Sequence, residues 1–387
     1  MRPDKAVNIA DLHRMAKRRL PKIVFDFIEG GCDGETVLAR NENSFLRYGL
    51  MPRFLIDTGK RDQSTTLFGR RYASPFGIAP TGLAALYRPR GDLLLAEAAG
   101  QADIPFIQSG ASTASMADVV KTAPDHAWYQ LYAPRDQTIT DDLVRRARDA
   151  GFGVLVLTID TQGSANHERN VRNGFSPAMT VKPSAALEAL RHPLWLADYL
   201  WHGMPAFEDW RAYAPAGASA KAVAQFVAAA GRVGLTWRDV ERIRGQWPGK
   251  FVLKGILSPD DAVRAAECGV DGIIVSNHGG RRMDRSPAAL DAFPAINAAV
   301  GARVTLMLDS GIRRGADILT ALSLGAKFCF TGRATLYGMA AGGLPGAQRA
   351  IAILRNEIDV VMSQIGCTAI PQLGPPLLFT HPARADR

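Results

Sequence analysis

The sequence predicts an α/β fold, a parallel (β/α)8 or TIM barrel, on three observations. Short apolar runs recur along the chain, each is apolar enough for a buried parallel strand, and helix-like segments separate most of them. The eight runs are PFGIAP (75–80), IPFIQS (104–109), WYQLY (128–132), GVLVLTID (153–160), FVLKGI (251–256), GIIVSN (272–277), VTLMLDS (304–310) and FCFTGR (328–333). Eight strand–helix repeats are the content of such a barrel.

The intervening helices carry recognisable ends. The segment SPDDAVRAAECG predicts a helix with Ser258 as N-cap, Pro259 in the first turn and Gly269 at its end. A second helix is predicted over 313–326 and ends at Gly325. A doubly wound open sheet is the alternative fold, but the segment PTGLAALYRPRGD after the first run lacks the GxGxxG fingerprint expected there.

Two regions lie outside the repeats of what we interpret as a single domain, 1–387. Residues 1–70 form an N-terminal helical segment, and the barrel occupies 71–175 and 236–365. Residues 176–235 form an insertion after the fourth strand, far longer than common loops of about 2 to 6 residues. Such an insertion is expected to serve as a lid or as a membrane-facing loop.

The insertion contains the segment HPLWLADYLWHGMPAF (192–207), which combines tryptophans, leucines and histidines. A helix docked on the barrel is the favoured interpretation, and an interfacial membrane helix is the other. Elsewhere the sequence has no apolar run of the roughly 18 residues that a spanning helix needs.

The charge balance favours anionic partners. Lysine and arginine number 46 against 37 acidic residues, a formal net charge of +9. An anionic substrate, cofactor or membrane surface would suit this balance. Nucleic acid is not an expected partner, because the arginines are dispersed and no basic stretch alternates with aromatic residues.

The cysteines suggest a reducing compartment. Cys32, Cys268, Cys329 and Cys367 are scattered without CxxC or Cys/His spacing, which argues against a disulfide framework and a metal site. Charges interrupt every apolar run near the N-terminus, so no signal peptide is expected. We therefore expect a cytoplasmic protein, with peripheral contact to the inner face of the cell membrane as an option.

The carboxyl ends of the predicted strands are polar, and in these barrels that end holds the chemistry. A ring of buried polar groups must be satisfied, which indicates a polar ligand. The residues at these ends are Pro80, Thr81, Gly82, Ser109, Gln130, Tyr132, Thr158, Asp160, Lys254, Ser276, His278, Asp309, Gly311, Gly332 and Arg333.

The last two strand ends indicate a phosphate site. The segment DSGIRRG supplies Gly311 and Arg313, and TGR supplies Gly332 and Arg333. Loops after strands seven and eight commonly bind phosphate in these barrels. At the fifth strand end, Lys254 is a lone cation in an apolar run, expected either to face an electron-rich ring or to pair with a carboxylate.

The segment SNHGGR after the sixth strand suggests acid–base chemistry. His278 can accept a proton near neutral pH, and Asp160 at another strand end can orient its imidazole. Arg281 can clamp a carboxylate in fork geometry. A histidine after a strand is often structural, but glycines that let the backbone approach a ligand favour a proton-abstracting site for an anionic acid.

Five motifs carry a resemblance to a known family: SNHGGRRMD, KGILSPDDA, DSGIRRGAD, FTGRATLYG and WYQLY. They resemble the FMN-dependent α-hydroxy acid oxidases and dehydrogenases, which include glycolate oxidase and L-lactate dehydrogenase. LPKIVFDFIEGG, PTGLAALYRPRGD and GRATLYGMAAGG are especially similar to the bacterial mandelate dehydrogenases of that family. The resemblance runs from about residue 8 to 368, and is broken mainly in the insertion.

The resemblance implies a role for each matching residue. It implies FMN contacts at Pro80, Thr81, Gly82, Ser109, Gln130, Thr158, Lys254 and Ser276, with ribityl and phosphate contacts at Asp309, Arg313, Gly332 and Arg333. It also implies that His278 is the base, Asp160 its partner, Arg281 the carboxylate clamp and Tyr132 a phenol facing the substrate.

Two substrate positions depart from the family pattern. Phe27, in VFDF, stands where the family usually has a tyrosine, and His167 stands where it has an arginine. Gly82 stands where the glycolate oxidases have alanine, which we expect to leave a methyl group's volume free. The open question is whether Arg169 or Arg172 replaces the missing charge.

The resemblance therefore implies oxidation of an L-2-hydroxy acid to the 2-oxo acid, and the departures favour an aromatic or bulky, mandelate-like substrate. The electron acceptor is expected to be oxygen or a quinone, and the assembly a homo-oligomer, commonly a tetramer in the family. The alternatives are the same flavin chemistry on a peptide or larger hydroxy substrate, a non-redox FMN barrel, or an inactive flavoprotein.

Overall fold

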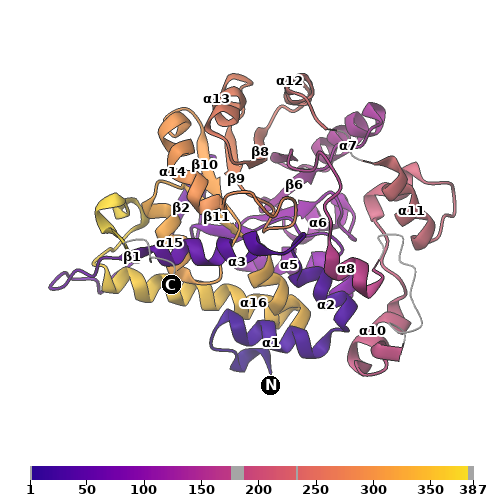
Figure 1. The fold of residues 1–387 in the computed structure, drawn as a ribbon, viewed down its shortest axis with the longest axis horizontal. Helices are drawn as coiled ribbons and strands as arrows, with labels where there is room; N and C mark the ends of the chain where they lie inside the picture. Colours follow the sequence, from indigo (N-terminus) through magenta and orange to yellow (C-terminus); the bar gives the residue numbers. More distant parts are fainter. Residues whose placement is uncertain (1, 176–186, 232–233, 382–387) are drawn as a thin grey trace.

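The predicted barrel is present in the computed structural model, which describes residues 2–175, 187–231 and 234–381. Its eight parallel strands close in the order β10-β11-β4-β5-β6-β7-β8-β9. Figure 1 labels β6, β8, β9, β10 and β11 of this barrel. The strands are β4 (Phe76–Ile78), β5 (Phe106–Ser109), β6 (Ala127–Leu131), β7 (Val154–Thr158), β8 (Lys250–Ile256), β9 (Gly272–Val275), β10 (Thr305–Leu308) and β11 (Phe328–Thr331). Each coincides with one of the eight apolar runs.

Helices surround the barrel. They are α4 (Ala84–Tyr87), α5 (Gly91–Gln101), α6 (Met116–Thr122), α7 (Gln137–Asp149), α12 (Trp237–Gln246), α13 (Pro259–Glu267), α14 (Ala289–Val300), α15 (Gly315–Ser323) and α16 (Arg333–Gln364). Ser258 is the N-cap of α13 as expected, although its side chain accepts no capping hydrogen bond.

Aromatic and branched side chains fill the interior of the barrel at the end opposite the carboxyl ends of the strands. Trp128 and Phe330 lie 5.4 Å apart between ring centroids, and both are buried. A hairpin of β2 (Thr65–Leu67) and β3 (Arg70–Tyr72) adds Leu67 to the same buried cluster. Because this end is packed solid, the opposite rim, where the strands end in polar residues, is the part available for a ligand.

The N-terminal segment packs against the C-terminal part of the chain, through α16 and the last strand. It contains η1 (Pro3–Lys5), α1 (Ile9–Arg19), α2 (Lys22–Glu29), α3 (Thr36–Asn43) and η2 (Ser44–Arg47). α1 lies along α16 (Figure 1). β1 (Tyr48–Leu50) then pairs antiparallel with β12 (Leu378–Thr380), after η4 (Ile370–Gln372) and η5 (Pro375–Leu377). The sequence did not indicate this pairing.

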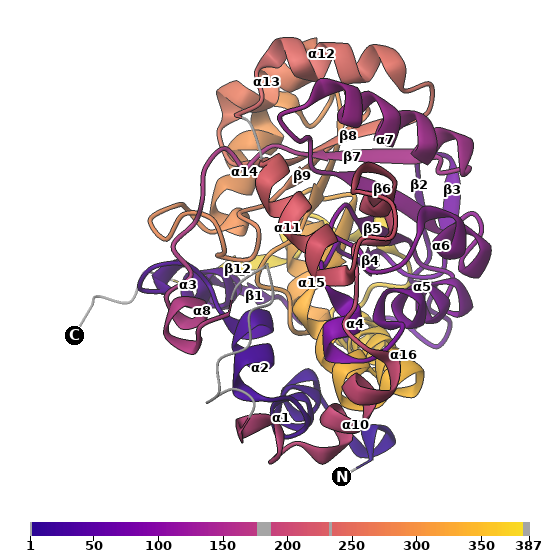
Figure 2. The same cartoon turned by 90° about the vertical axis from the view of Figure 1, so that its right-hand side faces the viewer.

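The insertion follows β7 and α8 (Glu168–Asn173), and part of it, 176–186 and 232–233, lies outside the described residues. Its described part forms α10 (Pro193–His202), η3 (Glu208–Tyr213) and α11 (Ala220–Ala230). In Figure 2, α11 lies in front of the barrel strands and α10 lies near α1. Within the described ranges, no helix is both long enough and apolar enough to cross a bilayer.

Within α16, the residues on the two sides of a break pack closely against each other. α16 breaks at Gly343, where φ is +65°, and a Cβ on Gly346 would lie 1.9 Å from the Gly338 carbonyl oxygen. We expect Gly346→Ala to lower the free energy of unfolding by about 1 to 3 kcal/mol through overpacking. Urea unfolding of the FMN-saturated protein measures this.

The matched control is Gly245→Ala on α12, an exposed position where an added Cβ meets no atom within 4 Å. This change should raise the free energy of unfolding by up to about 1 kcal/mol, because alanine favours helix. Equal effects of the two substitutions would contradict the close contact between Gly338 and Gly346.

Candidate active site

A cavity of about 820 Å³ opens at the carboxyl ends of the strands. Most of the predicted site residues line it: Phe27, Pro80, Thr81, Gly82, Tyr132, His167, Lys254, His278, Arg281, Asp309, Gly311, Arg313, Gly332 and Arg333. The others are polar residues buried close to it: Ser109, Gln130, Thr158, Asp160 and Ser276.

His278, Asp160 and Tyr132 form a connected group. His278 Nδ1 lies 3.0 Å from Asp160 Oδ1, and His278 Nε2 lies 3.2 Å from the Tyr132 hydroxyl. His278 has φ +60°, a strained conformation for a residue with a side chain, and Gly279 and Gly280 follow with positive φ. The strained backbone therefore turns the imidazole from the end of β9 towards Asp160 at the end of β7.

The environment keeps His278 neutral and Asp160 charged. Burial lowers the pKa of His278 below its ordinary value of 6.5, and Asp160 offsets this only in part. Burial opposes ionisation of Asp160, but the hydrogen bond with His278 and the charges of Lys254 and Arg282 outweigh it and lower the pKa of the carboxyl. A neutral imidazole beside a carboxylate is a competent base.

Lys254 is buried with two partners. Its ammonium donates to Ser276 Oγ at 2.9 Å and lies 3.0 Å from Asp309 Oδ2. Burial alone would lower the pKa of Lys254, but Asp309 and Asp160 more than compensate, so its pKa is raised. The carboxylate partner considered for Lys254 is therefore present, and a charged ammonium stands at the cavity wall.

Two buried side-chain atoms near the cavity indicate whether the rim could hold FMN. Gln130 accepts from Ser109 Oγ and from the Gly110 backbone, both at 3.3 Å. Gln130 Nε2 and Thr158 Oγ1, by contrast, are buried without a hydrogen-bond partner in the described part of the chain. Buried donors normally have partners, so these two suit the polar edge of a flavin ring.

Arg313 and Arg333, the two arginines predicted to contact phosphate, line the same cavity. Arg333 donates to the carbonyls of Ile28, Gly279 and Gly30 at 2.8 to 3.0 Å, and burial lowers its pKa to about 10. Arg313 lies 2.9 Å from Glu42. Arg333 has only neutral acceptors among the described residues, so a phosphate would suit this cation.

Arg281 is also partly buried against neutral acceptors. It donates to the carbonyls of Phe27 at 2.7 Å and Gly30 at 2.8 Å, and its guanidinium carbon lies 5.1 Å from the centre of the Phe27 ring. Among the described residues no carboxylate pairs with it, and burial lowers its pKa. A substrate carboxylate would supply the missing countercharge.

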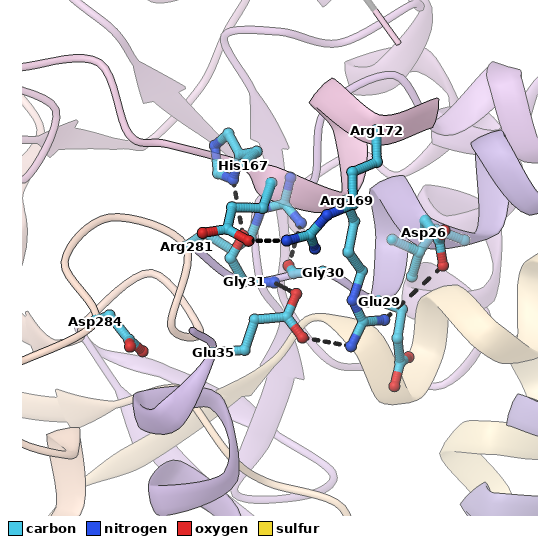
Figure 3. A network of polar contacts seen from close by, with 12 residues as sticks. Asp26, Glu29, Gly30, Gly31, Glu35, His167, Arg169, Arg172, Arg281 and Asp284 are labelled. Carbon is cyan, nitrogen blue, oxygen red and sulfur yellow. Dashed lines mark hydrogen bonds and ion pairs between the residues drawn. The ribbon is translucent and has the colours of Figure 1, made fainter. Parts of the chain in front are cut away.

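Neither Arg169 nor Arg172 supplies the charge that is missing at His167. His167 Nδ1 lies 2.9 Å from the Gly31 carbonyl (Figure 3), and burial lowers its pKa. Arg169 pairs with Glu35 and lies 3.8 Å from Asp26, and Arg172 pairs with Glu168. Neither arginine lines the cavity.

Gly82 lines the cavity and packs closely against Ala111. A Cβ on Gly82 would lie 3.0 Å from the Cβ of Ala111, so a methyl group there would press on the neighbouring loop. An alanine at position 82 would therefore fit only if Ala111 shifted by a few tenths of an ångström.

Sequence reasoning missed three contributors to the cavity: Phe175, α11 and Arg282. Phe175 stacks on Phe27 with ring centroids 4.5 Å apart, and α11 contributes Ala224 and Val227. Arg282 donates to the backbone carbonyls of Asp160 and Gly163 at 3.0 and 2.7 Å. The second arginine of SNHGGRR was a signal for Arg282, but no local pattern indicated the docking of Phe175 or α11.

Comparison with known proteins identifies the family. A model described as FMN-dependent dehydrogenase matches residues 16–380. The (S)-mandelate dehydrogenase of Pseudomonas putida is 36% identical over 371 residues, covering 96% of this chain and 93% of that protein. A putative L-lactate dehydrogenase of Mycobacterium tuberculosis is 38% identical over 373 residues, covering 96% and 88%.

A solved structure agrees with these sequence matches. The crystal structure of the monotopic membrane protein (S)-mandelate dehydrogenase superposes with a TM-score of 0.93 at 35% identity, covering 97% of this chain and all of that one. The cofactor of the matched family is FMN, which fits the unpartnered polar atoms below the cavity. The chain belongs to the FMN-dependent α-hydroxy acid dehydrogenase and oxidase family.

Proposed function

We propose that this protein oxidises an aromatic or bulky L-2-hydroxy acid to the 2-oxo acid, with His278 as the base. The observation that carries the proposal is the contact of a partly buried imidazole, whose pKa is lowered, with Asp160 and Tyr132 in a cavity that also holds Arg281. A non-redox FMN barrel has no need for this combination.

The residues divide the work. Arg281 binds the substrate carboxylate, Tyr132 orients the hydroxyl, and His278 takes a proton from Cα or from the hydroxyl. FMN, when bound, accepts the two electrons that leave the substrate. Lys254 places a positive charge where negative charge develops, at a buried position that strengthens its effect. Asp160 stabilises the imidazolium.

The substrate side is proposed to accept a ring. Phe27 and Phe175 form a stacked pair, and Phe207 and Val227 add apolar surface from the insertion. Burying apolar substrate surface contributes about 25 cal/mol per Å². Small acids such as glycolate gain little from this wall and lose the polar contacts that Phe27 and His167 no longer offer.

The electron acceptor is proposed to be a quinone, with oxygen as the alternative, at a membrane surface. α10 exposes Leu194, Leu200 and Trp201, each more than 70% accessible. The exposed cations Lys17 and Arg18 belong to α1, whose Arg19 pairs with Asp198 on α10. An apolar helix flanked by cations suits peripheral contact with an anionic bilayer. We also propose a homo-oligomer, as the family resemblance implies.

The role of His278 predicts the effect of His278→Gln. Flavin reduction by a hydroxy acid, followed anaerobically by loss of flavin absorbance, should slow by about 100-fold or more, because the base is lost while FMN stays bound. His126→Gln is the matched control. His126 Nε2 lies 2.9 Å from Asp103 Oδ1, and His126 does not line the cavity. Reduction by the His278 variant at the wild-type rate would remove His278 from the mechanism.

The direction of the His278 pKa predicts the pH dependence. The base must be neutral, and burial lowers its pKa below the ordinary value, so kcat/KM should level off as the pH rises above the pKa and fall as the pH drops through it. Asp160→Asn removes the charge that holds this pKa up, so the fall should begin at lower pH while the plateau rate decreases. A shift to higher pH would contradict the assignment.

The altered substrate residues predict selectivity. Mandelate-like acids should exceed glycolate and lactate in kcat/KM by at least about tenfold, roughly 1.4 kcal/mol. The double substitution Phe27→Tyr with His167→Arg should narrow this gap by restoring a hydrogen bond and a charge. Equal efficiency on glycolate and mandelate would refute the proposal, whereas turnover of neither would favour a larger hydroxy substrate.

A further inference from the structure

A second cavity lies behind α4. It has a volume of about 270 Å³ and lies between α10 and the segment that joins α4 to α5. Ala85 and Leu86 of α4 face this cavity, whereas Leu83 and Tyr87 line the active-site cavity. The two cavities are therefore separated by a single short helix, and the proposed chemistry does not use the second one.

Two arginines of the second cavity, Arg88 and Arg90, form no ion pair with a described residue. Asp198 pairs with Arg19, and Glu208 lies 2.7 Å from Arg211, so both acidic groups of the cavity wall are already matched. Arg88 and Arg90 have no acidic partner in the described part of the chain.

Arg88 is the more constrained of the two. Its side chain is half-buried, and its Nε is buried without a hydrogen-bond acceptor. Burial and the nearby Arg19 lower its pKa, and the charge of Asp198, which is already paired with Arg19, offsets this only in part. An unpaired guanidinium at a cavity wall is costly to bury, so this cavity suits an anion.

The position of the cavity indicates which anion. Trp195 and Tyr199 of α10 face the cavity, while Leu194, Leu200 and Trp201 of the same helix are exposed. An interfacial helix sinks about 5 to 10 Å into the boundary between headgroups and acyl chains, and a helix is about 10 Å across. If the exposed side of α10 enters a bilayer, its other side lies at the level of the lipid phosphates.

We propose that the cavity of Arg88 and Arg90 binds the phosphate headgroup of an anionic membrane lipid. The proposal rests on the proposed membrane contact of α10 and adds to it a specific headgroup site. Arg88 and Arg90 donate to the phosphate oxygens, while α10 anchors the protein through its exposed leucines and tryptophan. The site sets a preference for anionic over neutral lipid and takes no part in substrate oxidation.

The test compares binding to vesicles of phosphatidylcholine with binding to vesicles that also contain phosphatidylglycerol, by co-sedimentation of the FMN-saturated protein. The wild type should prefer phosphatidylglycerol, and Arg88→Gln should lose at least about tenfold of that preference, because a charged hydrogen bond is removed. Arg191→Gln, an exposed arginine of the same insertion, should lose about fivefold or less, as a surface cation does. Equal losses in the two variants would overturn the site.

Further variants separate this proposal from the others. Leu200→Ser with Trp201→Ser should weaken binding to both kinds of vesicle, and unchanged binding would refute the membrane contact itself. With any hydroxy acid that reduces the flavin of the wild type, Arg88→Gln should be reduced at the wild-type rate. This comparison does not depend on mandelate being the substrate. A tenfold loss in that rate would instead assign Arg88 to the active site and overturn the headgroup role.

Soluble anions distinguish a lipid from a free phosphate. With FMN in excess, inorganic phosphate or glycerol phosphate at submillimolar concentration should leave the Tm of the wild type unchanged, because the lipid's acyl chains and α10 supply most of the affinity. A rise in Tm with either anion that Arg88→Gln abolishes would assign the cavity to a soluble phosphate and overturn the lipid assignment.

Discussion

Closure of the barrel through the pairing of β11 with β4 is the constraint on which the site depends. Because all eight strands are parallel, closure brings every carboxyl end to one rim. Asp160 and His278 follow β7 and β9, which are separated by β8, and their side chains meet across it. Gly255 in β8 makes room, since a Cβ there would lie 2.7 Å from the Cβ of Asp160.

The rim also concentrates positive charge. Lys254, Arg281 and Arg333 all line the cavity, but only Lys254 has a carboxylate partner among the described residues, Asp309. The two arginines are held by backbone carbonyls and share Gly30 as an acceptor. Buried cations held only by neutral groups are costly, which suits a site that receives the phosphate of a cofactor and the carboxylate of a substrate.

Much of the fold could be predicted from the sequence because its signals are local. Each strand is a continuous apolar run, and each run turns polar where the strand ends, so the eight strands and their rim residues could be read in order. The meeting of His278 with Asp160 follows from this arrangement once the barrel closes. The rest depends on contacts between distant segments.

Those distant contacts explain the misses. β1 and β12 are three residues long and lie more than 300 positions apart, so no sequence pattern links them. Phe175 reaches Phe27 only because of how the insertion docks. The backbone directs a methyl group at position 82 towards Ala111. Glu35 pairs with Arg169 and so decides whether that arginine faces the site.

The central claim is that His278 and Asp160 act as one unit. A double-mutant cycle of His278→Gln and Asp160→Asn, read out as the anaerobic rate constant of flavin reduction, tests it most directly. The account predicts strong non-additivity, with the double variant little slower than His278→Gln alone. Rate losses that add independently would contradict it.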